Sequence, residues 1–162
     1  PESVKEVTRA SKGALKKTPL IVKLSPNVES IAVNALAAQE GGADAVSLVN
    51  TFTGMVIDIE RRRPLIANNT GGVSGAGIMP IAVRMTHEVC SAVTVPVIGM
   101  GGITCAEDAL QFIIAGASAV QVGTANFTDT LAMPKIIAGL NAWLDGHGIG
   151  NINELRGTLK LN

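Results

Sequence analysis

The chain has 162 residues, and its 13 basic and 13 acidic side chains leave no formal net charge. Hydrophobic residues make up 47% of it and charged residues only 16%, which excludes an intrinsically disordered chain. The balanced charge and the 2% of aromatic residues argue against a nucleic-acid-binding surface, which needs a basic face or stacking rings.

The first part of the chain predicts helices and strands in alternation, over residues 2–16, 20–24, 28–40 and 45–49. The run 20–24 is almost wholly apolar, which is typical of a strand buried on both faces of a parallel sheet. The chain begins with Pro1 rather than Met and enters a helical pattern at once. We therefore expect it to be part of a longer protein.

A polar segment over 52–69 interrupts this alternation. Residues 55–59 and 64–67 flank a charged stretch, 60–63, which predicts a hairpin with a solvated, charged tip. The glycine-rich stretch 71–77 follows and leads into a helix over 79–92. Pro80 falls in the first turn of that helix, where its missing N–H costs little.

The rest of the chain alternates again, with strands over 95–100 and 119–122, helices over 105–115 and 131–145, and a helical turn within 151–158. Four strand–helix units with short connections predict a parallel sheet. A complete (β/α)8 barrel takes about 250 residues. The predicted fold class is therefore α/β, with residues 1–162 forming the C-terminal half of a TIM barrel; a small doubly wound sheet is the alternative.

In this architecture, chemistry lies at the C-terminal ends of the strands. Gly101-Gly102 and Gly123-Thr124 end two consecutive strands. Glycines let an anion approach backbone N–H groups, and the loops after the last two barrel strands commonly hold a phosphate. We predict a phosphate site here. The alternative is that these glycines serve only tight turns, as at 41–42.

Two other strand ends carry polar side chains. Lys23 lies in an apolar strand, where a buried lysine is costly unless a negative group pairs with it. We interpret it as a cation facing a phosphate, an enolate or a reduced flavin, and extension into solvent is the alternative. Asn50-Thr51 suits a planar polar ligand, although both residue types also cap helices. Residues 72–75 indicate either a helix cap or a close backbone approach to a ligand.

No residue has the setting of a general base. His87 falls in the middle of a helix and His147 in a turn, while Cys90 and Cys105 fall in or beside outer helices. The two cysteines lack CxxC spacing, which argues against a zinc site and suits a reducing cytoplasm. We also expect no metal, no signal peptide and no membrane span, because no apolar run reaches ~18 residues.

Taken together, the strand ends resemble the dihydroorotate dehydrogenases, most of all the NAD-linked class 1B catalytic subunits. The resemblance covers essentially the whole chain in order, through Lys23-Leu24-Ser25-Pro26-Asn27, Val49-Asn50-Thr51, Gly71-Gly72-Val73-Ser74-Gly75, Val97-Ile98-Gly99-Met100-Gly101-Gly102-Ile103 and residues 120–127. The segments Ile57-Asp58 and Arg62-Arg63-Pro64 of the expected hairpin make the resemblance more specific.

The resemblance implies a barrel that binds FMN and oxidises dihydroorotate to orotate in pyrimidine biosynthesis. It implies that Lys23 lies beside the pyrimidine end of the flavin, where a cation favours the anionic reduced form. Asn50 and Thr51 would hydrogen-bond the orotate ring. The remaining implied flavin contacts are Val49 and Gly75 beside the ring and Gly101, Gly102, Gly123 and Thr124 at the phosphate.

In this family a base takes the C5 proton of dihydroorotate while C6 gives hydride to flavin N5. The electrons reach NAD through a partner subunit that carries FAD and an iron–sulfur cluster, and a homodimer of catalytic subunits within a heterotetramer is implied. The class 1 base is a cysteine upstream of this segment, which neither Cys90 nor Cys105 matches. We therefore expect no catalytic base in this chain and no activity from it alone.

Two other functions remain open from the sequence. A flavin-dependent dihydropyrimidine dehydrogenase resembles the same motifs, and the base loop and substrate contacts of the missing half would distinguish it. The second is an isolated half-barrel that binds phosphate or flavin without catalysis.

Overall fold

The computed structural model describes all 162 residues and is built around one parallel sheet. Its strands lie in the order β1 (Ile21–Lys23), β2 (Ala45–Leu48), β7 (Val97–Met100) and β8 (Ala119–Gln121). In the register of this sheet, Lys23 pairs with Ser47, Ser47 with Ile98, and Ile98 with Ala119. The predicted α/β class with a four-stranded parallel sheet is confirmed.

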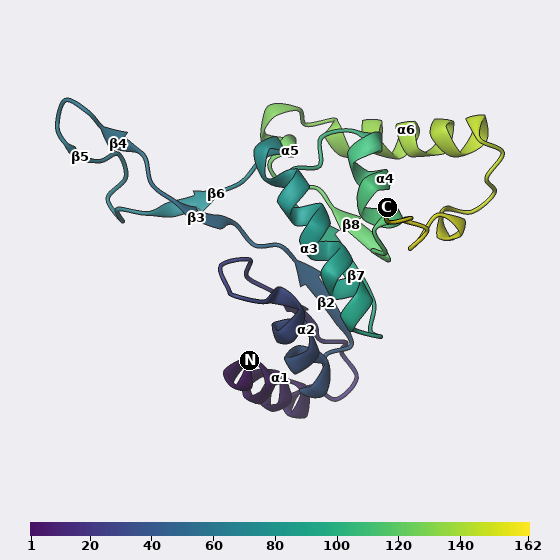
Figure 1. Cartoon of the computed structure of the whole chain (residues 1–162), viewed down its shortest axis with the longest axis horizontal. Helices are drawn as coiled ribbons and strands as arrows, with labels where there is room; N and C mark the ends of the chain where they lie inside the picture. Colours follow the sequence, from purple (N-terminus) through teal and green to yellow (C-terminus); the bar gives the residue numbers. More distant parts are fainter.

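The helices follow the predicted order, with one short helix in addition. They are α1 (Glu2–Ala14), α2 (Ile31–Glu40), α3 (Met79–Ala92), α4 (Ala106–Ile114), α5 (Ala125–Thr128) and α6 (Ala132–Gly146), with short 3-10 turns η1 (Ala76–Ile78) and η2 (Ile152–Glu154). The short α5 is the additional helix that was not predicted. Pro80 lies in the first turn of α3, as predicted. Helices α2, α3 and α4 pack against the sheet, and α6 packs on α4 (Figure 1).

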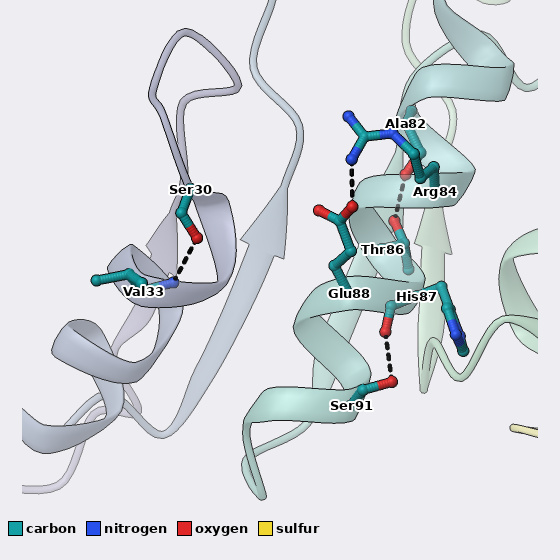
Figure 2. Close-up of polar contacts among 8 residues, drawn as sticks. All are labelled: Ser30, Val33, Ala82, Arg84, Thr86, His87, Glu88 and Ser91. Atoms are coloured by element: carbon teal, nitrogen blue, oxygen red, sulfur yellow. Dashed lines mark hydrogen bonds and ion pairs between the residues drawn. The ribbon is translucent and has the colours of Figure 1, made fainter.

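Local hydrogen bonds explain where α2 begins and how α3 holds a buried hydroxyl (Figure 2). The Ser30 hydroxyl accepts a hydrogen bond from the Val33 N–H at 3.4 Å, so α2 starts three residues later than predicted. Within α3, the fully buried Thr86 hydroxyl donates to the Ala82 carbonyl at 2.8 Å. That bond satisfies the hydroxyl inside the core.

The core lies between the sheet and these helices. Val46 and Leu48 of β2 and Phe112 of α4 are completely buried in it. A Cβ on Gly99 of β7 would lie 2.5 Å from the Phe112 ring. Gly99 therefore leaves the space in the sheet that this ring fills.

The other face of the sheet is more exposed. Ile21 is 50% exposed, and Lys23, Ala119 and Gln121 on the same face are also exposed. Within these 162 residues, contrary to the prediction, the Lys23 face of residues 20–24 is not buried, and Lys23 itself is exposed. The physical reason is that β1 is an edge strand and its Lys23 face has little packed against it.

Residues 52–73 form an arm that projects from the body (Figure 1). In it, β3 (Phe52–Gly54) pairs antiparallel with β6 (Gly71–Val73), and β4 (Ile57–Asp58) with β5 (Arg63–Pro64). The predicted hairpin with a charged tip is confirmed, with shorter strands. Two glycines in three residues gave no strand signal for β6, whose pairing depends on its partner β3.

No helix combines the length and apolarity that crossing a membrane requires. The chain contains no group of three or more His, Cys, Asp or Glu side chains arranged to hold a metal ion.

Candidate functional site

A cavity of about 850 Å³ lies where the four strands of the sheet end. Its lining includes all nine binding residues predicted from the sequence: Lys23, Val49, Asn50, Thr51, Gly75, Gly101, Gly102, Gly123 and Thr124. They come from the ends of β1, β2, β7 and β8 and from the turn before η1. The parallel sheet brings them together because the carboxyl ends of its strands share one edge.

Lys23 is the one ionisable side chain among the residues that line this cavity. It forms no ion pair with any carboxylate of the chain. An anionic ligand would therefore meet one cation and no acidic side chain. This charge distribution suits a phosphate or another anion.

The backbone of two glycine turns forms part of the wall. Gly75 and Gly102 have positive φ angles, +98° and +81°. A Cβ on Gly102 would lie 2.8 Å from both the Gly75 carbonyl oxygen and the Met79 Cβ. The two turns thus pack together more closely than any side chain at Gly102 would allow.

Gly123 is different, because no heavy atom lies within 4 Å of the position its Cβ would take. Its φ angle also lies outside the left-handed region. The fold therefore does not require glycine here. The space beside Gly123, a residue of the cavity lining, is open.

A hydrogen bond joins two turns of the cavity wall that are fifty residues apart in sequence. The Thr124 hydroxyl donates to the Ser74 hydroxyl oxygen at 2.9 Å. This contact connects the turn after β6 to the turn before α5. Ser74 was predicted only as part of the motif 71–75, and no local pattern in the sequence indicates its hydrogen-bond partner.

The segment after β2 is also held from several sides. The Asn50 side-chain oxygen accepts a hydrogen bond from the Thr51 N–H at 2.9 Å, while the Asn50 side-chain nitrogen has no partner in the chain. A Cβ on Gly72 would overlap the Thr51 side chain. Gly72 therefore leaves space for Thr51, and Gly75 is the residue before η1, in agreement with the cap interpretation. The other interpretation of residues 72–75, a close backbone approach to a ligand, stays a prediction.

The lining contains no Asp, Glu, His or Cys. Cys90 lies half-buried on α3, and burial raises the pKa of its thiol to about 11. Cys105 is exposed before α4, and partial burial raises its pKa as well. His87 lies on α3, and His147 stacks on Trp143 with ring centroids 3.8 Å apart. None of these four groups reaches the cavity.

Several known proteins similar to this chain belong to one family. The family model described as dihydroorotate dehydrogenase matches residues 1–144. Similar curated proteins are the dihydroorotate dehydrogenase B (NAD(+)) catalytic subunits of Pelobacter propionicus, Bacteroides fragilis and Trichlorobacter lovleyi, which are 53%, 52% and 54% identical to this chain over 160 residues. In each case the match covers 99% of this chain and 52% of the relative.

The chain thus spans about half the length of the curated relatives it matches. The family match nevertheless extends over most of the chain and includes every strand of the sheet and every residue of the cavity lining. The chain therefore belongs to the dihydroorotate dehydrogenase family.

Proposed function

We propose that this chain forms the FMN-binding, C-terminal half of the barrel in a class 1B dihydroorotate dehydrogenase. The complete enzyme would oxidise dihydroorotate to orotate in pyrimidine biosynthesis. The single observation that supports this most is the cavity at the strand ends, where nine residues implied by the family resemblance converge.

The cavity suits FMN in size and charge. Its volume of about 850 Å³ is within the range of cofactor pockets. Gly101, Gly102, Gly123 and Thr124 would hold the phosphate, and the open space beside Gly123 leaves room for it. Lys23 would place its charge near the flavin ring. FMN, when bound, supplies the two-electron acceptor for the reaction.

Asn50 and Thr51 would bind the substrate ring. The Asn50 side-chain nitrogen remains available as a donor, because only the oxygen of this amide is used within the chain. The Thr51 hydroxyl can both donate and accept. Orotate carries carbonyl and N–H groups in one plane, so this pair is suited to recognise it.

The exposed sheet face supports the half-barrel assignment. Four strands cannot close a barrel, and the edge strand β1 carries side chains that are exposed in this chain. The other half of the barrel would cover this face and would supply the proton-accepting cysteine and the remaining substrate contacts. The chain on its own would then be inactive.

The complete enzyme would also need a partner. The relatives are named as catalytic subunits linked to NAD(+), which supports a second subunit that carries electrons away. We infer that this partner holds FAD and an iron–sulfur cluster, and that catalytic subunits pair as a homodimer within a heterotetramer. A cytoplasmic location agrees with the two free cysteines.

The test uses the complete enzyme that contains these 162 residues. We expect the purified protein to show a flavin absorbance spectrum that dihydroorotate bleaches anaerobically and dihydrouracil does not. A colourless protein that takes up no FMN would overturn the flavin assignment. Bleaching by dihydrouracil alone would instead identify a dihydropyrimidine dehydrogenase.

A further inference from the structure

Asn27 lies just beyond β1 and binds the backbone of the segment between β2 and β3. Its side-chain nitrogen donates to the Thr51 carbonyl at 2.9 Å, and its side-chain oxygen accepts from the Thr53 N–H at 2.9 Å. Both ends of the amide are therefore used on one short stretch of main chain. The Asn27 N–H itself donates to the Ser25 hydroxyl at 3.2 Å, which restrains the turn that carries it.

These two bonds continue the pairing of β1 with β2 by means of a side chain. The last main-chain bonds between the two segments run from the Leu24 N–H to Ser47 and from the Asn50 N–H to Leu24. Pro26 has no N–H to offer beyond that point. In a parallel ladder, a residue donates its N–H to the carbonyl that precedes one residue of the neighbouring strand. Its own carbonyl accepts from the N–H that follows that residue. The Asn27 amide does this around Phe52.

Asn27 is exposed, so it contributes little to the core. One of its hydrogen bonds instead restrains Thr51. The Thr51 N–H also donates to the Asn50 side-chain oxygen, and the Thr51 side chain packs over Gly72. Thr51 is thus held through its N–H, its carbonyl and its side chain. A change at Asn27 would release one of these three restraints and leave the sheet intact.

We propose that Asn27 is a positioning residue, which fixes Asn50-Thr51 in the geometry that binds the substrate ring. This inference rests on the proposed function, in which that pair contacts orotate. Asn27 itself need not touch the ligand. Its effect should fall on orotate affinity and not on FMN affinity, because the FMN phosphate would be held at β7 and β8, away from this contact.

The test compares two variants of the complete, FMN-loaded enzyme. Asn27→Ala removes both bonds to the main chain, together with the 3.4 Å bond from the Asn27 side-chain nitrogen to the Ser25 hydroxyl. Asn27→Asp keeps the acceptor for the Thr53 N–H but places a carboxylate oxygen, in place of the donor, against the Thr51 carbonyl. We expect each to raise the Kd for orotate, measured by calorimetry, about tenfold. The Kd for FMN, measured by fluorescence, should change less than about twofold, and the Tm by less than about 3 °C.

Asn34→Ala is the matched control, because the Asn34 amide donates to the Ser30 carbonyl at 3.0 Å within α2, and it should leave both affinities unchanged. Unchanged orotate affinity in both Asn27 variants would overturn the inference. So would a parallel loss of orotate and FMN affinity, which indicates a merely structural role. A wild-type enzyme that binds FMN but no orotate would overturn the proposed function itself, and this inference with it.

Discussion

Lys23 ends an apolar strand, yet its side chain is exposed and has no acidic partner. Burial alone therefore does not explain a lysine at this position. Its place in the cavity lining does, since an anionic ligand would pair with it there. In the proposed function, the site depends at the scale of single residues on this one charge and on glycines that keep backbone and space accessible.

Replacement of Lys23 by Ala in the complete enzyme should slow flavin reduction by dihydroorotate at least about tenfold, because removing a nearby cation costs ~1.4 kcal/mol or more of charge stabilisation. The Tm should change little, since the side chain is exposed and unpaired. Stopped-flow absorbance measures the reduction rate. Lys17→Ala, at another exposed lysine outside the cavity, is the control. Equal rates in Lys23→Ala and wild type would show that Lys23 has no such role.

Two glycines of the cavity should respond differently to the same change. Gly123→Ala places its methyl group in open space, so we expect unchanged folding but FMN affinity weakened about tenfold, as the methyl group competes with the phosphate. Gly102→Ala meets the Gly75 carbonyl at a positive φ and should cost about 1–3 kcal/mol in stability. Urea unfolding measures the stability of each variant, and FMN titration measures its affinity for FMN. Full FMN affinity in Gly123→Ala would remove this turn from the phosphate site.

The elements hold each other through a few side chains that cap or bridge their ends. The Gln39 side-chain oxygen of α2 accepts from the Thr94 N–H at 2.8 Å, which ties α2 to the loop before β7. Asp108 of α4 accepts from the Thr104 hydroxyl at 2.7 Å and from the Cys105 N–H at 3.2 Å. These bonds stabilise the start of α4 beside the cavity, because Thr104 lines it.

The capping of α4 should make stability depend on pH. Partial burial raises the pKa of Asp108, but the hydrogen bonds from Thr104 and Cys105 outweigh it and hold the pKa below its usual value. A depressed folded pKa means that this contribution is present above the unfolded pKa of ~3.9 and is lost as the pH falls through the folded value.

Asp108→Ala should therefore cost about 1 kcal/mol at pH 7 in urea unfolding. Its difference from wild type should shrink as the pH falls below ~4. Asp145→Ala, at an exposed aspartate whose side chain makes no hydrogen bond, should change stability by less than about 0.5 kcal/mol. A penalty for Asp108→Ala that is constant down to acid pH would show that its charge is not involved.

The whole molecule has two parts, a body and an arm, which differ in how well their apolar side chains are packed. The body packs helices on one face of the sheet, whereas the arm consists of short paired strands and turns (Figure 1). Several apolar side chains of its turns and connecting segments are exposed. Ile59 is 81% exposed, Leu65 66% and Val56 64%. Side chains this exposed contribute little to the stability of the body.

Replacing residues 56–66 at the arm tip with a short Gly/Ser linker should therefore shift the Tm of the protein by less than about 3 °C, since loop length has only a weak effect on stability. Phe112→Ala provides the contrast. It leaves a cavity in place of the fully buried ring and should lower the free energy of unfolding by about 3–5 kcal/mol. Circular dichroism melting measures both. A large loss of Tm on removing the tip would show that the arm supports the body.

The order of elements, the parallel sheet and the positions of the strand ends were predictable from the sequence alone. Short apolar runs, helical spacing and glycines at the turns are local signals, and parallel strands must present their carboxyl ends on one edge. The sequence therefore predicts Lys23, Asn50 and Gly123 as residues of one site.

Other features were decided only by the tertiary structure, because each depends on residues distant in sequence. The exposure of β1 depends on what packs against the sheet, and β6 is a strand only because β3 pairs with it. The bond from Thr124 to Ser74 spans fifty residues. The Asn27 amide reaches across to Thr51 in the same way. Side-chain hydrogen bonds between turns leave no periodic pattern in a sequence, so only the folded chain reveals them.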